Sequence, residues 1–388
     1  MSITGFRSQL LPHVERGTVP AVLAVRSGRS GHEVFTASAP AGNRLELDSL
    51  VRIGSLTKPI VATATLVLAE RGVFALDDAV DRYLPELADR RVLRRLDGPL
   101  DDVEPARHEI TVRHLLTCTM GFGFPMTRGP HPILDAAAAL GVAPRPPKPR
   151  THLSPEHWLG RFASLPLMAE PGTAWMYDTS YSVLGVLLGR VCAAPLEDVL
   201  RELVFDPLRM IDSGFFVPTA RRHRLVPCAL AGDERQFDGA MDSQWTTPPP
   251  FPDAAGGLIS TADDFLRFGH MLLAGGVLDG RRVLGESSVA LMTSNHIQDG
   301  HRGPASGPFL EQRGWGLGVA VAVSHGDPWS RPGRYGWDGG FGTSWFNDAH
   351  AGDVALLVTQ RFPPAFEVFA AFWEASGRPS GEPSSAGG

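Results

Sequence analysis

The stretch GSLTKP, residues 54–59, places a serine and a lysine three positions apart, as Ser55 and Lys58. A serine hydroxyl is a weak nucleophile at neutral pH, so it needs a nearby base or a cation that stabilises its alkoxide. On a helix, residues three apart share a face, and the N–H groups at the helix start favour an oxyanion. The pattern is typical of an activated serine, although a helix cap followed by an exposed lysine has the same spacing.

Lysine is scarce in this chain, which draws attention to position 58. Lys58 and Lys148 are its two lysines, among 36 lysine and arginine residues in total. Arginine does not deprotonate in proteins, whereas a buried lysine changes its pKa readily. A task in proton transfer is therefore a physical reason to keep a lysine beside Ser55. Lys148 lies in a proline-rich stretch, residues 142–155, which we expect to be a solvated surface loop.

The elements around Ser55 follow from local patterns. A long helix is expected to begin at or just after Ser55 and to end near Gly72, and residues 19–35 predict a strand hairpin. Helical patterns dominate from about residue 75 to 200 and return at 261–276 and 366–375. Strand-like runs at 314–323, 342–348 and 353–362 lie close in sequence, which favours antiparallel pairing.

These patterns predict an α+β fold in one catalytic domain, residues 1–375, with two lobes. Residues 1–74 and 205–375 are expected to form an α/β sandwich lobe, an antiparallel sheet flanked by helices. Residues 75–204 are expected to form an all-helical lobe, and the composition of residues 376–388 predicts a disordered tail.

Composition excludes several classes of function. The formal charge of −6 gives no basic field for nucleic acid. No apolar run reaches the roughly 18 residues of a membrane span, and the start of the chain does not read as a secretory signal, so we expect a cytoplasmic protein. Three cysteines without a CxxC pair and 13 histidines without an HExxH pair predict neither a metal site nor a cofactor.

Several stretches, in order, carry a resemblance to a known family: residues 51–87, 110–122, 170–191, 254–276 and 335–348. They resemble the serine β-lactamase-related hydrolases, which include class C β-lactamases, D-alanyl-D-alanine carboxypeptidases, family VIII carboxylesterases and related transacylases. The resemblance implies a β-lactamase/transpeptidase-like fold and a Ser-x-x-Lys nucleophile, with Ser55 forming an acyl-enzyme and Lys58 beside it.

A second motif resembles the family's Tyr-x-Asn and is here Tyr177-Asp178-Thr179. The resemblance implies that Tyr177, as a partial phenolate near Lys58, takes the serine proton and returns it to the leaving group. The chain departs from the pattern at Thr179. Threonine offers one short hydroxyl where asparagine offers a carbonyl and an amide, so recognition of a peptide or β-lactam amide by this substrate-binding position is not expected.

A third motif resembles the family's Lys-Thr-Gly strand and is here Trp337-Asp338-Gly339, followed by Gly340. The resemblance implies that these three residues line the substrate site and that the N–H of Gly340 completes an oxyanion hole with the N–H of Ser55. Trp337 stands where the family has a cation, which favours an apolar or aromatic acyl group.

Trp245, in a proline-rich loop, is a further candidate for substrate binding, with loop anchoring as the equal alternative. We therefore expect a serine esterase or transacylase that passes an acyl group from a small ester or amide to water, an alcohol or an amine. The alternatives are a β-lactamase or D-aminopeptidase/carboxypeptidase-type amide hydrolase and an inactive homologue that serves binding or assembly. The sequence leaves the natural acyl donor, the acceptor and the oligomeric state open.

Overall fold

A computed structural model describes residues 4–40, 42–127, 129–233, 235–303, 306, 309–310, 312–326 and 329–377. The helices are α1 (Thr4–Glu15), α2 (Thr57–Glu70), α3 (Val112–Leu116), α4 (Pro132–Leu140), α5 (Pro155–Ala163), α6 (Thr179–Val191), α7 (Leu196–Leu200), α8 (Asp206–Leu208), α9 (Ala262–Leu273), α10 (Glu286–Met292) and α11 (Phe366–Gly377). The strands are β1 (Ala21–Gly28), β2 (Gly31–Ser38), β3 (Val51–Arg52), β4 (Arg91–Leu93), β5 (Val103–Pro105), β6 (Cys228–Leu230), β7 (Gln236–Asp238), β8 (Ile259–Ser260), β9 (Val277–Leu278), β10 (Arg281–Arg282), β11 (Arg313–Trp315), β12 (Ala320–Ala322), β13 (Arg334–Gly339), β14 (Thr343–Asp348), β15 (Asp353–Val358) and β16 (Arg361–Phe362).

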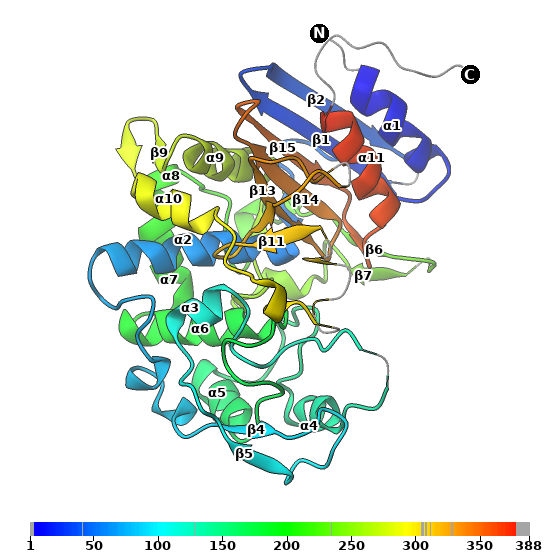
Figure 1. Ribbon diagram of the computed structural model, residues 1–388. Coiled ribbons are helices and arrows are strands. Elements are labelled where there is room, and N and C mark those ends of the chain that lie inside the picture. The colour runs from blue at the N-terminus through cyan, green and yellow to red at the C-terminus, as the bar shows by residue number, and fades with distance from the viewer. Residues whose placement is uncertain are drawn as a thin grey trace.

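An antiparallel sheet is the centre of the fold, with the strand order β11-β12-β13-β14-β15-β1-β2 (Figure 1). The N-terminal hairpin β1–β2 therefore joins strands from the C-terminal part of the chain through the β1–β15 pair. The α+β fold expected from the sequence, with an antiparallel sheet flanked by helices, is confirmed.

The two faces of the sheet pack against different helices because successive side chains on a strand point to opposite sides. On β14, the ring of Trp345 meets the α9 rings of Phe265 and Phe268 at centroid distances of 5.4 and 6.0 Å. The neighbouring Phe346 meets Phe372 of α11 at 5.8 Å on the other face. Helices α1 and α11 lie together on that second face (Figure 1).

The middle of the chain forms the part that lies below the sheet in Figure 1, with α3, α4, α5 and α6. The short antiparallel pair β4–β5 adds strands to a stretch for which the sequence indicates helices. The lobe boundaries at residues 74 and 205 stay a prediction. The expected domain end at residue 375 falls inside α11, and residues 378–388 of the expected tail lie outside the described residues.

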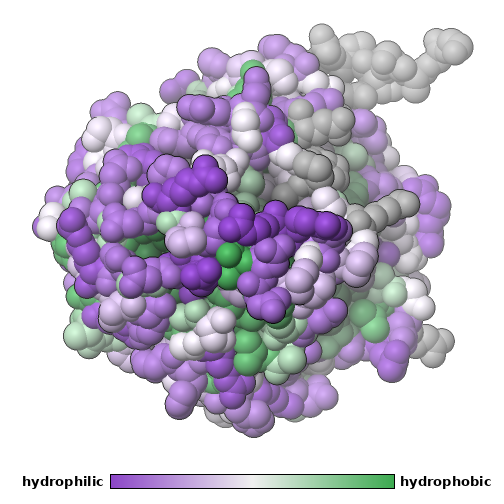
Figure 2. All heavy atoms as spheres, turned by 60° about the horizontal axis from the view of Figure 1, so that its bottom comes forward, coloured by the Kyte–Doolittle hydropathy of each residue, from purple (hydrophilic) through white to green (hydrophobic). Residues whose placement is uncertain are grey.

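Hydrophilic residues cover most of the face in Figure 2, and hydrophobic residues gather in smaller patches between them. Within the part of the chain that the structure describes, no helix has the length and apolar character needed to cross a membrane.

Candidate active site

Ser55 lies in a single 3-10 turn, Gly54–Leu56, between strand β3 and helix α2. Gly54 adopts a φ of +56°, a left-handed conformation that favours glycine. The turn runs directly into α2, whose N-cap residue is Leu56 and has no side-chain cap. The serine hydroxyl is therefore not used as a helix cap, which is the structural alternative that the spacing leaves open.

Lys58 is fully buried in the first turn of α2 and points its ammonium group at Ser55. Its Nζ donates to the carbonyl of Ala255 at 2.5 Å and to Asp178 Oδ1 at 3.0 Å, and it lies 3.4 Å from Ser55 Oγ. Burial acts to lower the pKa of Lys58, but the charges of Tyr177 and Asp178 outweigh it and raise the pKa above its usual value. Lys58 is therefore held as an ammonium, whose N–H groups face Ser55, Asp178 and the carbonyl of Ala255.

The phenol oxygen of Tyr177 lies between a donor and a cation. The indole N–H of Trp337 donates to it at 2.5 Å, and Tyr177 lines the same cleft as Ser55. The ammonium of Lys58 also lies 4.3 Å from the centre of the Tyr177 ring. Burial raises the pKa of Tyr177, while Lys58 and the hydrogen bonds from Ser55 and Trp337 act to lower it, with a net rise.

Asp178 is a site residue that the sequence reasoning missed. Its carboxylate forms the ion pair with Lys58, and its backbone has a φ of +94°, which is rare for a residue other than glycine. The strained backbone directs this side chain toward the lysine instead of capping α6. The signal in the sequence was the need of any buried lysine for a counter-ion, next to the motif tyrosine.

The backbone of Gly340 lies beside the turn that carries Ser55. A Cβ atom placed on Gly54 would come within 3.1 Å of the Gly340 nitrogen. The hydroxyl of Thr343, on β14, donates to the carbonyl of Ile53 at 2.9 Å and ties the β13–β14 hairpin to this turn. The amides of Ser55 and Gly340 thus lie on adjoining backbone segments, as an oxyanion hole requires.

A cleft of about 670 Å³ opens in front of Ser55 and Tyr177. Aromatic side chains from several distant segments line it: Phe124, Phe309, Trp337, Phe341, Phe362, Phe366, Phe369 and Trp373. Asp338 and Gly339 also line the cleft, and Asp338 lies 3.3 Å from Arg313 in an ion pair. Of the substrate-binding candidates, the structure thus brings Trp337, Asp338 and Gly339 to Ser55.

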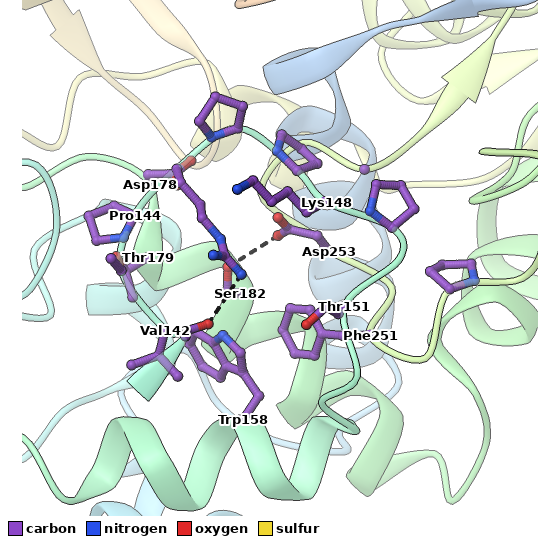
Figure 3. A pocket seen from close by; sticks show the side chains of 18 of the residues that line it. Val142, Pro144, Lys148, Thr151, Trp158, Asp178, Thr179, Ser182, Phe251 and Asp253 are labelled. Atoms are coloured by element: carbon purple, nitrogen blue, oxygen red, sulfur yellow. Dashed lines mark hydrogen bonds between the residues drawn. The ribbon is translucent and has the colours of Figure 1, made fainter. Parts of the chain in front are cut away.

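Trp245 and Thr179 do not line this cleft. Trp245 is fully buried, and its indole N–H donates to the carbonyl of Gly257 at 2.8 Å, so it anchors its loop. Thr179 is the first residue of α6 and faces a second cavity on the other side of Asp178 (Figure 3). Loop anchoring is one of the two roles that the sequence leaves open for Trp245, whereas the cavity at Thr179 depends on how loops pack and is not visible in the spacing. Among the described residues there is no group of histidine, cysteine, aspartate or glutamate side chains that could hold a metal ion.

Comparison with known proteins identifies the family of the chain. A family model described as Beta-lactamase matches residues 13–376. Protein Rv1367c of Mycobacterium tuberculosis (strain ATCC 25618 / H37Rv) is 36% identical over 344 residues, which cover 86% of this chain and 82% of the relative. Esterase EstB of Burkholderia gladioli is 32% identical over 374 residues, 89% of this chain and 86% of the relative.

The solved structure of EstCE1, a hydrolase with promiscuous acyltransferase activity, has a similar fold. It superimposes with a TM-score of 0.78 over 96% of this chain and 97% of that one, at 22% sequence identity.

Proposed function

The chain belongs to the β-lactamase family, and on that premise we propose that it is a serine esterase or acyltransferase that works through an acyl-enzyme on Ser55. The observation that carries this proposal is the grouping of Ser55, Lys58 and Tyr177 at the cleft, with Lys58 Nζ 3.4 Å from Ser55 Oγ and 4.3 Å from the centre of the Tyr177 ring. The charge of Lys58 and the hydrogen bond from Trp337 both favour the phenolate over the phenol at this oxygen. The reactive form therefore carries the phenolate.

In the acylation step, the phenolate of Tyr177 takes the proton of Ser55 as Oγ attacks the ester carbonyl. The ammonium of Lys58, 3.4 Å from Oγ, stabilises the negative charge on both oxygens. The N–H groups of Ser55 and Gly340 hold the tetrahedral oxyanion, and a donor of this kind contributes about 3 kcal/mol to the transition state. Tyr177 then returns its proton to the departing alkoxide, and an incoming water or alcohol repeats the steps in reverse.

The lining of the cleft indicates an ester with a bulky, apolar acyl group. Aromatic rings dominate its wall, and Phe366, which is 60% exposed, extends the apolar surface to the mouth. Each methylene group of the acyl chain buried there contributes about 0.8 kcal/mol to the binding free energy.

Position 337 holds an indole in place of a cation, and Arg313 is already in contact with Asp338. A substrate carboxylate, as in penicillins or D-alanyl peptides, therefore meets an indole at position 337 and an already paired Arg313, and we propose weak or absent β-lactamase activity.

The test is intact-protein mass spectrometry after exposure to a fluorophosphonate and to an activated ester. We expect one adduct in the wild type and none in Ser55→Ala. A folded wild type that forms no adduct would favour the inactive, binding homologue. In parallel, the protein is expected to cleave p-nitrophenyl esters faster than it opens nitrocefin, and the reverse order would favour the β-lactamase alternative. A cytoplasmic location stays a prediction.

A further inference from the structure

A second cavity lies next to the cleft, under the proline-rich loop of residues 142–155 (Figure 3). Its volume is about 40 Å³, enough for about three water molecules. Five residues line both spaces and form the wall between them: Arg145, Pro146, Pro147, Asp178 and Asp253. The cavity therefore adjoins the cleft that holds Ser55.

From this geometry we infer that the second cavity binds the acceptor of acyl transfer, a neutral alcohol of about three or four heavy atoms. The inference rests on the proposed function, since it assigns the second substrate of the same acyl-enzyme. The cavity has three features that select such a ligand: an unpaired hydroxyl, acceptors for a hydroxyl proton, and an aromatic surface.

The unpaired hydroxyl belongs to Thr179. Its side chain is 2% exposed, and its Oγ1 has no hydrogen-bond partner among the described residues. A buried polar atom without a partner costs free energy, which a ligand bound in the cavity recovers by pairing with it. Because a threonine hydroxyl both donates and accepts, it suits the hydroxyl of an alcohol.

The acceptors are the carboxylates of Asp178 and Asp253. Asp253 Oδ1 accepts from Ser182 Oγ at 3.1 Å and from the amide of Ala255 at 2.9 Å, and Figure 3 shows its carboxylate directed into the cavity. Asp178 Oδ1 is 3.0 Å from Lys58 Nζ, which is in turn 3.4 Å from Ser55 Oγ. Asp178 is therefore two contacts from the acylated oxygen, and it lines the cleft as well as the cavity.

The apolar part of the ligand has a ready surface. Trp158 of α5 and Phe251 stack with their ring centres 5.1 Å apart, and both line the cavity opposite Asp253 (Figure 3).

The charges around the cavity decide which class of ligand it binds. Arg145 and Lys148 line the cavity together with the two carboxylates, and Lys58 lies behind them. An ammonium meets these cations and an anion meets the carboxylates, whereas a neutral alcohol meets neither penalty.

The transfer step is balanced without a further reactant. The alcohol oxygen attacks the carbonyl of the ester on Ser55, and its proton passes to the Tyr177 phenolate. The bond from the carbonyl carbon to Ser55 Oγ then breaks, and Oγ takes the proton back from Tyr177. The products are the new ester and free Ser55.

The experiment measures how one acyl-enzyme divides between two acceptors. A p-nitrophenyl ester is turned over in the presence of methanol, ethanol, 1-propanol or tert-butanol, and the ratio of alkyl ester to free acid is determined by chromatography. This ratio does not depend on the amount of folded enzyme. We expect the wild-type ratio at equal alcohol concentration to be highest for ethanol and 1-propanol and lowest for tert-butanol.

Two variants and a matched control test the site. Thr179→Val keeps the shape and removes the hydroxyl, so we expect the ratio to fall about two- to tenfold for every alcohol. Thr151→Leu narrows the cavity from the loop side, so the ratio should fall more for 1-propanol than for methanol. Thr65→Val makes the same exchange at a buried position of α2 outside the cavity lining, and we expect the wild-type ratio.

An unchanged ratio in both Thr179→Val and Thr151→Leu would overturn the assignment. A higher ratio in either variant would also overturn it, because the cavity would then supply water for hydrolysis. The absence of alkyl ester with any alcohol in the wild type would count against it as well. Failure of the proposed function itself is seen separately, as the absence of nitrophenol release and of the Ser55 adduct.

Discussion

The hydrogen bond from the Trp337 indole to the Tyr177 oxygen offers the sharpest test of the catalytic geometry. Trp337→Phe keeps an aromatic ring in the wall and removes the donor, which lies 2.5 Å from the phenol oxygen. A hydrogen bond to a charged group is worth about 1.5–3 kcal/mol. If Trp337 stabilises the phenolate in the transition state, kcat/KM for a p-nitrophenyl ester should fall about 10- to 100-fold.

The pH dependence of kcat/KM shows in which direction loss of the Trp337 donor shifts the pKa of Tyr177. Burial raises the pKa of Tyr177, and the Trp337 donor works against that rise. The phenolate fraction, and with it kcat/KM, should increase with pH in the wild type. Loss of a donor to the phenolate raises the pKa of Tyr177 further. The midpoint of the alkaline rise should therefore move to higher pH in Trp337→Phe.

Trp315→Phe is the matched control, because this second buried indole stands next to Trp337 at a ring-centre distance of 4.7 Å. Its N–H donates to the carbonyl of Leu116 at 3.2 Å and does not reach the phenol oxygen. Both exchanges should destabilise the fold by a similar amount, about 1–3 kcal/mol. The reasoning is refuted if the two variants lose the same activity and keep the wild-type pH midpoint.

Three further changes test the surroundings. Burial and the charge of Asp178 raise the pKa of Asp253 from 3.8 to about 6, so between these values the folded state holds the proton that the unfolded state loses. Ionisation of Asp253 above pH 6 therefore costs the folded state up to about 3 kcal/mol. In urea titrations, Asp253→Asn should raise the free energy of unfolding by up to this amount above pH 6 and leave it unchanged below pH 4. Gly54→Ala should cost about 1–2 kcal/mol in the same titrations, since its φ is +56°, whereas Gly340→Ala should fold normally because a Cβ there meets nothing within 4 Å. Lys58→Arg should lower kcat/KM about 10²- to 10⁴-fold, since a guanidinium is too large for the pocket between Ala255 and Asp178, and full activity would show that charge alone suffices.

The sequence predicted those features that local chemistry or a family pattern determines. The antiparallel sheet and the helix that starts just after Ser55 follow from periodicity and turn residues, and the structure confirms them. Ser55 and Tyr177 are far apart in the chain, so their meeting could be expected only from the resemblance. The need of a buried lysine for a counter-ion was visible, but the choice of Asp178 as its partner was not, because it depends on a backbone conformation at Asp178 that an aspartate rarely adopts.

The packing of loops and helices escaped prediction for the same reason. Trp245 points inward because Gly257 offers its carbonyl there, and no spacing rule contains that contact. The apolar helix α11 was expected, but not that Phe369 and Trp373 on it line the cleft beside Ser55. A helix pattern shows that one face is apolar, and only the fold decides what that face meets.

The charge balance around Tyr177 bears on the reaction class as well as on binding. The ammonium of Lys58 acts to lower the pKa of Tyr177 and the carboxylate of Asp178 acts to raise it, while position 337 contributes the neutral indole donor of Trp337 in place of a cation. A cation at position 337 would act strongly in so buried a site and would lower the pKa of Tyr177. With an indole the pKa stays above its usual value, so the phenolate is a strong base and the phenol a weak acid. An amine leaving group needs a good acid to depart, whereas the oxygen of an ester departs with less help. The exchange of a cation for Trp337 therefore favours ester over amide chemistry at Ser55.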